Sequence, residues 1–246
     1  MSILKTISEE FGITSEEDLY HAYANILEDT YSNCLFSLAV GGLGFTDMVY
    51  RTHGPVCQIL QSETKRKLVC LPRGTFKSSL CCVTYPIWLL LNNPNLRILI
   101  DSELYTNSKN FLREIKAHLE GERLTHIYGA FKTDSNWNEN EITINQRSIP
   151  RKEASITAAG IGTEKTGQHY DIIICDDLNG PQNSNTQEGR QRVVDHYKYL
   201  QAILEPTGTM VVVGTRYADD DIIGWILKNE VNSPKENLGK TIMLGE

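Results

Sequence analysis

The chain has 246 residues, of which 40% are hydrophobic and 22% are charged. This composition is typical of a folded globular protein and excludes the disordered, collagenous and coiled-coil classes. The length fits one large α/β domain with decorations. The formal net charge of −7 repels phosphate, so any contact with nucleic acid would depend on local basic patches.

The sequence contains no recognisable targeting signal and no recognisable zinc-binding motif. The longest apolar run, residues 86–91, is far shorter than the ~20 residues that cross a membrane, and the N-terminus has no features of a secretory signal. We therefore expect a cytoplasmic protein without a membrane span. The six cysteines contain no CxxC pair and predict reduced, packed thiols. No histidines have the spacing of a zinc site, so we predict no zinc.

Residues 1–60 are expected to form an N-terminal helical decoration or lid. Thr14 and Glu17 have the spacing of a capping box, and apolar residues recur behind them at helical intervals, so a helix should begin near Ser15. The glycine-rich segment 41–44 breaks this pattern, and a second helical stretch covers residues 49–60.

From residue 61 to residue 246, short apolar runs alternate with longer helical patterns, which favours a mainly parallel sheet covered by helices. The run 172–175 is apolar throughout and predicts a central buried strand, whereas 141–145 and 155–158 have the pattern of half-buried strands. Further strands are expected at 68–71, 97–100 and 210–213, and helices at 78–91, 107–119, 186–204 and 221–228.

The segment 71–79, between a predicted strand and a predicted helix, has the position of a phosphate-binding loop. Lys77 can reach the β- and γ-phosphates, the Ser78 hydroxyl can bind Mg²⁺, and free backbone N–H groups of the first helical turn face the anion. The consensus G-x-x-x-x-G-K-[ST] has glycines where this chain has Leu71 and Phe76. Taken alone, the segment also fits a chance Lys-Ser pair at a helix start.

Acidic and polar groups follow two further strands. Asp176 and Asp177 end the buried run, at the carboxyl end where ligands of open α/β sheets bind. One carboxylate can hold Mg²⁺ and the other can polarise an attacking water, although paired aspartates can also simply cap a strand. Thr215 follows the next apolar run and could sense a γ-phosphate; a plain turn with an exposed Arg216 is the alternative.

Together, these segments resemble the ATPase part of the large terminase subunit of tailed bacteriophages, the motor that packages DNA into capsids. The resemblance spans roughly residues 53–227. It is carried by LPRGTFKSS (71–79), SITAAGIGTEKTGQHYDIIICDD (155–177), a helical spacer with Arg190-Gln191-Arg192, and GTRYADDDIIGWIL (214–227). The last segment is the most specific, because terminases of this type commonly carry GTRW/Y followed by acidic residues and a glycine.

The resemblance implies an α/β fold of the P-loop NTPase type (ASCE class) over residues 61–246, with ATP and Mg²⁺ as cofactors. Asp177 would be the catalytic carboxylate, Thr215 would belong to the coupling motif, and Ser78 and Asp176 would be the metal ligands. Lys77 and Arg73 would also be catalytic. The nucleotide would be bound by Arg73, Gly74, Thr75, Phe76, Lys77, Ser78 and Ser79.

This sequence departs from the family pattern at two places. Phe76 replaces a glycine, which implies a wider loop or a low nucleotide affinity. The family often has an arginine just before the strand that ends in the acidic pair, and this arginine acts on a neighbouring subunit. Here that arginine is missing, and the region offers only Lys165. Because the chain stops about thirty residues beyond Arg216, we expect the C-terminal nuclease domain of large terminases to be absent.

The function implied is ATP-driven translocation of double-stranded DNA into a procapsid in the host cytoplasm. Expected partners are DNA, the portal protein, the small terminase subunit and further copies in a ring on the portal. Alternatives are a helicase-like or other nucleic-acid-stimulated ATPase and a non-hydrolysing nucleotide-gated scaffold. A nuclease built from Asp101, Glu103 and Asp219–Asp221 is a more distant alternative.

Residues that contact DNA are harder to predict. Basic groups occur in clusters, each of which is also compatible with an ordinary solvated surface. Trp137 lies in a polar segment and is expected to be exposed for base stacking, whereas Trp88 and Trp225 should pack in the core. The candidate phosphate-binding clusters are Lys65-Arg66-Lys67, Arg113 with Lys116, and Arg147 with Arg151 and Lys152.

Overall fold

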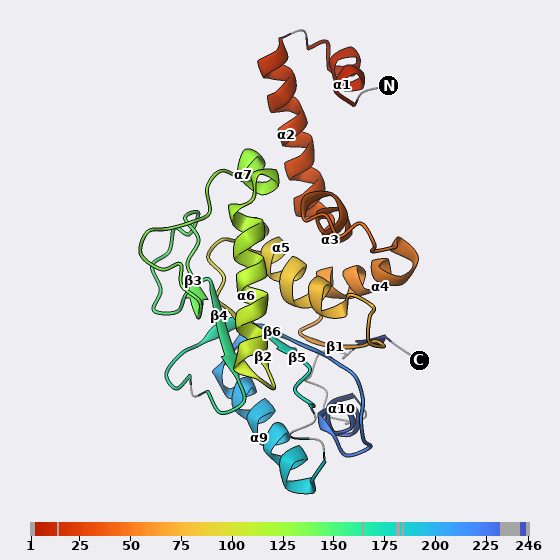
Figure 1. Cartoon of the computed structure of the whole chain (residues 1–246), viewed down its shortest axis with the longest axis vertical. Coiled ribbons are helices and arrows are strands. Elements are labelled where there is room, and N and C mark those ends of the chain that lie inside the picture. The colour runs from red at the N-terminus through yellow and green to blue at the C-terminus, as the bar shows by residue number, and fades with distance from the viewer. Residues whose placement is uncertain are drawn as a thin grey trace.

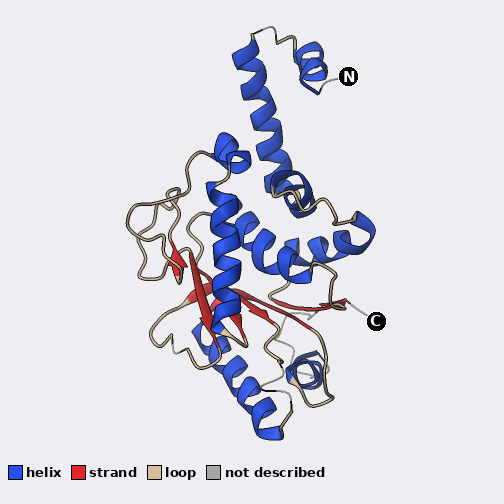
Figure 2. Cartoon of the chain, in the orientation of Figure 1, coloured by secondary structure: helices blue, strands red, loops and turns tan. Residues whose placement is uncertain are grey.

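The computed structural model describes residues 3–13, 15–163, 165–180, 183, 185–231 and 242–244. Within these residues a seven-stranded sheet has the order β3-β4-β2-β5-β6-β1-β7, and helices cover both of its faces (Figures 1 and 2). Neighbouring strands are parallel except for the pair β3–β4. The strands are β1 Arg66–Cys70, β2 Ile98–Ser102, β3 Glu141–Ile142, β4 Ile156–Gly160, β5 Tyr170–Asp176, β6 Leu204–Gly214 and β7 Ile242–Leu244.

The helices divide between the two faces of the sheet (Figure 1). On one face lie α4 Tyr50–Gln61, the π-helical η2 Ser79–Thr84 continued by α5 Tyr85–Asn92, and α6 Tyr105–Glu120; on the other lie α9 Gln187–Ile203 and α10 Ile222–Ile226. The remaining elements are α1 Ile3–Phe11, α2 Glu16–Asn33, α3 Leu35–Ser37, η1 Leu38–Gly42, α7 Glu122–Tyr128 and η3 Leu227–Val231.

Apolar residues of the central strands alternate between these two layers. Ile172 and Ile174 of β5 join the core under α4–α6, while Ile173 and Cys175 point to the core under α9 and α10. This alternation follows from the two-residue repeat of a strand, and it makes every position of a doubly covered parallel strand apolar. The prediction of a central buried strand at 172–175 and of a mainly parallel α/β sheet is confirmed.

Most other predicted elements are confirmed, with shifts at their ends. The helix expected near Ser15 is α2, whose N-cap is Ser15 itself: the Ser15 side chain accepts a hydrogen bond from the Asp18 amide. The predicted capping residue Thr14 lies outside the described residues. The strand around 210–213 begins earlier, at Leu204, and helices α1 and α7 and strand β7 have no counterpart in the sequence prediction.

The two strands predicted to be half-buried need correction. β4 is buried at all five positions, because α6 packs on one face of it and the α9 layer on the other. The predicted strand 141–145 is reduced to the two residues of β3. Beyond Ile142 the chain turns back, and Thr143 and Asn145 donate their amides to Asn136 and Phe131 instead of to a neighbouring strand.

The N-terminal residues extend away from the sheet. α1 and α2 project from the body of the molecule, whereas α4 packs beside β1 (Figure 1). The N-terminal end of α2 is the end that lies farther from the body. The last turn of α2 contacts α5, where Trp88 Nε1 and Asn92 Nδ2 both donate to the Ser32 carbonyl at 2.9 and 3.0 Å. In the part of the chain that is described, no helix has the length and apolar character needed to cross a bilayer.

Candidate functional site at the carboxyl edge of the sheet

Three predicted segments meet at the carboxyl ends of β1, β6 and β5. Cys70 of β1 is in register with Gly214 of β6, and Asp176 of β5 with Val213 of β6. The segment 71–78 leaves β1, Asp177 leaves β5 and Thr215 leaves β6 at the same edge. The parallel topology therefore brings together residues that are up to 144 positions apart, as in the hydrogen bond from Thr215 Oγ1 to the Leu71 carbonyl at 3.5 Å.

The loop after β1 turns tightly into a helix. Gly74 and Phe76 have positive φ angles of 78° and 54°, and the Thr75 hydroxyl donates to the Pro72 carbonyl at 2.7 Å. The helix begins where the Leu80 amide donates to the Phe76 carbonyl. Ser79 is the first residue of η2. Amides in the first turn of a helix lack carbonyl partners inside that helix, so this turn can receive an anion.

Lys77 and Asp177 face each other across this edge. Lys77 is buried, and its Nζ lies 3.8 Å from Asp177 Oδ2. Asp177 adopts a positive φ of 41°, and its Oδ1 is buried without a hydrogen-bond partner among the described residues. A non-glycine residue in this conformation costs energy, and such strain gathers at functional sites. Within the described residues, the pair therefore has one carboxylate oxygen without a hydrogen-bond donor and a lysine whose ion-pair partner is 3.8 Å away.

Ser78 and Asp176 form the second contact of the site. The Ser78 hydroxyl donates to Asp176 Oδ1 at 2.8 Å. Burial raises the pKa of Asp176 to about 6, with a further contribution from the negative charge of Asp177, while the Ser78 hydrogen bond and the Lys77 charge oppose the increase. Hydroxyl and carboxylate oxygens are the donors that Mg²⁺ prefers. The adjacent oxygens of Ser78 and Asp176 fit such an ion.

Arg73 contacts the segment after β6. Its guanidinium donates to the Tyr217 hydroxyl and lies over the Tyr217 ring, 5.7 Å from the centroid. Both side chains are exposed. The Arg73 side chain therefore links the loop after β1 to the segment after β6, and a contact with phosphate would require it to leave Tyr217.

Sequence reasoning missed two residues at this edge, Tyr217 as the partner of Arg73 and His53 from α4. His53 is buried, and its Nε2 lies 3.1 Å from the Thr75 carbonyl oxygen inside the loop. Tyr217 belongs to the GTRY segment, but that segment does not show its contact with Arg73, and His53 carries no recognisable motif. Both contacts arise from the packing of one element on another, and a lone histidine in an amphipathic helix gives no signal of it.

The carboxylates of the alternative nuclease site have separate structural partners. Asp101 is fully buried and contacts His196 Nε2 at 2.9 Å, and Glu103 accepts from Asn183. Asp221 caps α10 by accepting from Gly224, while Asp219 pairs with Arg216. No three His, Cys, Asp or Glu side chains of the described residues come together as a metal site.

Some residues of the predicted basic clusters, and the predicted stacking residue, contact other parts of the protein instead. Lys67 is buried and donates to the Leu60 and Ser62 carbonyls, and burial followed by the charge of Lys65 lowers its pKa to about 8. The prediction of a surface phosphate contact at Lys67 is therefore wrong. Trp137 is half-buried against the core, so its predicted exposure is wrong as well. Trp88 and Trp225 pack against the two cores as predicted.

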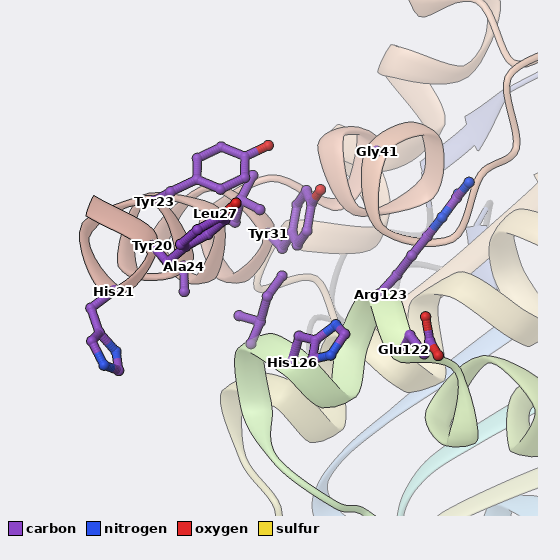
Figure 3. A pocket seen from close by; sticks show the side chains of 11 residues that line it. Tyr20, His21, Tyr23, Ala24, Leu27, Tyr31, Gly41, Glu122, Arg123 and His126 are labelled. Atoms are coloured by element: carbon purple, nitrogen blue, oxygen red, sulfur yellow. The ribbon is translucent and has the colours of Figure 1, made fainter. Parts of the chain in front are cut away.

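A cavity of about 610 Å³ lies away from this edge, between α2 and α7 (Figure 3). Tyr23 and Tyr31 of α2 and Arg123 and His126 of α7 line it. None of the predicted nucleotide-binding residues contributes to its wall. The size of this cavity is therefore no guide to the chemistry at the sheet edge.

Comparison with known proteins finds one similarity at the level of sequence that bears on the family. No protein-family model matches the chain. Over 160 residues, which are 64% of this chain, the sequence is 27% identical to the large terminase subunit of Enterobacteria phage T3. The match covers 27% of the T3 protein, so the chain spans about a quarter of the length of this relative. The resemblance to large terminase subunits is confirmed.

Two solved structures are similar to the fold. Dbp5 of Saccharomyces cerevisiae, in a complex that contains ADP, superposes with a TM-score of 0.50 at 12% identity, over 83% of this chain and 51% of that one. A point mutant of the large terminase ATPase domain of Thermus phage P74-26 gives a TM-score of 0.48 at 13% identity, over 78% of this chain and 76% of that one. The likeness to Dbp5 shows a similar fold, and the mainly parallel sheet flanked by helices confirms the expected α/β class.

Proposed function

We propose that this chain is the ATPase domain of a viral DNA-packaging motor, which hydrolyses ATP with Mg²⁺ to translocate double-stranded DNA into a procapsid. The observation that carries the proposal is the convergence of Lys77, Ser78, Asp176 and Asp177 at one edge of the sheet, with contacts of 2.8 and 3.8 Å. The sequence similarity to the T3 large terminase subunit supports the biological setting.

In the proposed mechanism, Lys77 and the amides of residues 74–79 bind the β- and γ-phosphates of ATP. Asp177, whose side chain is 40% exposed, accepts a hydrogen bond from the attacking water and orients it. Thr215 bonds to the loop carbonyl of Leu71, and in this proposal it passes a change in the loop to the segment after β6. Arg73 exchanges Tyr217 for phosphate as nucleotide binds.

The proposed magnesium ligands are Ser78 and Asp176. When bound there, Mg²⁺ would neutralise negative charge on the phosphates. A pKa of about 6 leaves the Asp176 carboxylate ionised at neutral pH, and ionisation is required of a metal ligand. The Ser78 hydroxyl donates a hydrogen bond to Asp176, so its oxygen lone pairs stay available to the ion.

The wider assignments are also proposals. Residues 1–60 would be a helical decoration, residues 61–246 the ATPase core, and the site of action the host cytoplasm. Partners would be DNA, the portal protein and the small terminase subunit, with further copies in a ring. Lys165, whose amide donates to the Tyr199 hydroxyl at 2.7 Å, is the candidate for action on a neighbouring subunit. Specific activity that rises with protein concentration or added portal would support such assembly.

The first experiment is phosphate release by the 246-residue chain with saturating ATP and Mg²⁺. We expect slow, steady release that is lost in the Lys77→Ala variant. ATP binding without release would instead favour a nucleotide-gated scaffold. Strand separation on a forked duplex would favour a helicase-like ATPase, and nicking of plasmid DNA with Mn²⁺ would favour a nuclease.

A further inference from the structure

The backbone of the phosphate-binding loop at Phe76 requires an explanation. Its φ of 54° lies in the left-handed region, where a side chain with a Cβ is strained and glycine is not. The consensus loop has glycine at this position. A phenylalanine can hold the same conformation only if neighbouring groups stabilise it, and those groups should contact both its ring and its backbone.

His53 of α4 contacts the backbone just before Phe76. His53 Nε2 lies 3.1 Å from the Thr75 carbonyl oxygen, and because a carbonyl only accepts, Nε2 carries the hydrogen. His53 Nδ1 lies 3.0 Å from the Val49 amide nitrogen and 2.9 Å from the Val49 carbonyl oxygen. The imidazole thus has a partner at both nitrogens. Only 4% of the residue is exposed, so these two bonds fix the ring in place.

His53 also contacts the Phe76 side chain. The two rings lie edge to face, with centroids 6.2 Å apart and planes at 66°. Phe76 remains partly exposed on its other side. α4 therefore holds this part of the loop at two points, the Thr75 carbonyl and the Phe76 ring, and both contacts come from one histidine.

The orientation of the Thr75 carbonyl determines that of the next amide. The peptide between Thr75 and Phe76 is trans, so its C=O and N–H point in opposite directions. Because the carbonyl points to His53, the Phe76 N–H points away from α4. We infer that His53 is a positioning residue that holds this peptide so that the Phe76 amide is presented to a nucleotide phosphate. His53 thereby replaces the conformational freedom of the missing glycine.

This inference rests on the proposed function, and nucleotide binding without hydrolysis tests it. Mg²⁺-ADP is titrated into the full chain by calorimetry. His53→Leu should weaken ADP binding on the order of five- to tenfold, the value of one lost hydrogen bond. His53→Gln keeps an N–H at the position of Nε2 and should restore most of the affinity. His53→Asn has its N–H at the position of Nδ1 and should behave like His53→Leu.

Two controls separate positioning from general damage. AMP lacks the phosphate that the loop cradles most closely, so AMP affinity should change less than ADP affinity in His53→Leu, whereas partial unfolding would reduce both alike. Phe76→Gly should raise ADP affinity more in the His53→Leu background than in the wild type, because glycine adopts the required φ without support.

The outcomes distinguish a failure of the proposed function from a failure of the role of His53. A wild-type chain that binds no ADP overturns the proposed function and this inference with it. A wild type that binds ADP, with His53→Leu equally tight, overturns only the role of His53. If His53→Leu fails to fold, the comparison of His53→Gln with His53→Asn decides, and equal affinities in that pair overturn the role.

Discussion

The charged residues at the two edges of the sheet differ in how completely they are paired. At the amino ends of β2, β5 and β6, Arg97 is buried and bonds to Asp171 at 2.8 and 3.0 Å and to Glu205 at 2.8 Å. Its own amide also donates to Asp171. At the carboxyl edge, the ion-pair partner that the described residues give Lys77 lies 3.8 Å away, and within the same residues a buried oxygen of Asp177 has no hydrogen bond.

The pKa values show the same contrast. Burial by itself would raise the pKa of Asp171, but the hydrogen bonds and charge of Arg97 lower it below its usual value. The pKa of Asp176 is raised to about 6, because burial and the charge of Asp177 outweigh its hydrogen bond to Ser78. A charge whose partners are supplied by the fold serves stability, whereas a charge left short of partners is held for a ligand.

The largest expected effect is at Asp177. Asp177→Asn keeps the shape of the side chain but removes the charge that orients water, so turnover should fall by about 10² to 10⁴. ADP affinity and melting temperature should stay close to wild type. Steady-state phosphate release and calorimetry measure the two quantities. Asp171→Asn, the same change at the amino edge, serves as the control and should leave turnover unchanged.

Lys77→Ala should act on binding. Removing a buried cation from the proposed phosphate site should weaken ATP binding by about 10- to 100-fold, because a hydrogen bond to a charged group contributes about 1.5–3 kcal/mol. Lys109→Ala removes a half-buried lysine paired with Glu139 and should not change ATP binding. If Lys77→Ala and Asp177→Asn lose ATP affinity to the same extent, the division of roles between them is wrong.

Arg97→Leu should reverse the pattern. It leaves the half-buried Asp171 and Glu205 and the buried Glu153 without their cation and should lower the free energy of unfolding by about 3 kcal/mol. Turnover per folded molecule should not change. Chemical denaturation measures the first quantity and phosphate release below the melting temperature the second. A large fall in turnover with intact stability would show that the two edges are not functionally separate.

The smallest effect is expected at the contact between Arg73 and Tyr217. Both side chains are exposed, so their interaction contributes little to stability. Arg73→Ala should lower turnover because the proposed phosphate contact is lost. Tyr217→Phe removes only the hydroxyl that accepts from Arg73 and should leave turnover within about threefold of wild type. If Tyr217→Phe is as slow as Arg73→Ala, the role of Arg73 is to hold the segment after β6.

The sequence is informative where the pattern is local. The apolar run before Asp176 and Asp177 specifies β5 by itself, because a strand covered on both faces has no polar position. Lys77 and Ser78 are likewise recognisable from their place between a strand and a helix. Thr215 comes to the same edge because parallel strands align their carboxyl ends.

The parts that the sequence does not reveal depend on packing between elements. Lys67 belongs to a basic triplet that suggests a surface, yet strand alternation places it on the same face as Val69, beneath the end of α4. His53 and Tyr217 are defined by what they touch, at separations of 22 and 144 residues. β3 is short because its continuation pairs with a loop, which no periodic pattern shows.

The projecting α2 gives the molecule a lever. Its 18 residues span about 27 Å, so a tilt of about 10° at the base moves the far end by about 5 Å. The base is held by Trp88 and Asn92 through the Ser32 carbonyl, and both belong to α5, which continues the helix that starts at Lys77. Tyr128 of α7 donates to the Glu28 carbonyl of α2, so a tilt of α2 that follows a shift of α5 would have to break this bond or carry α7 along.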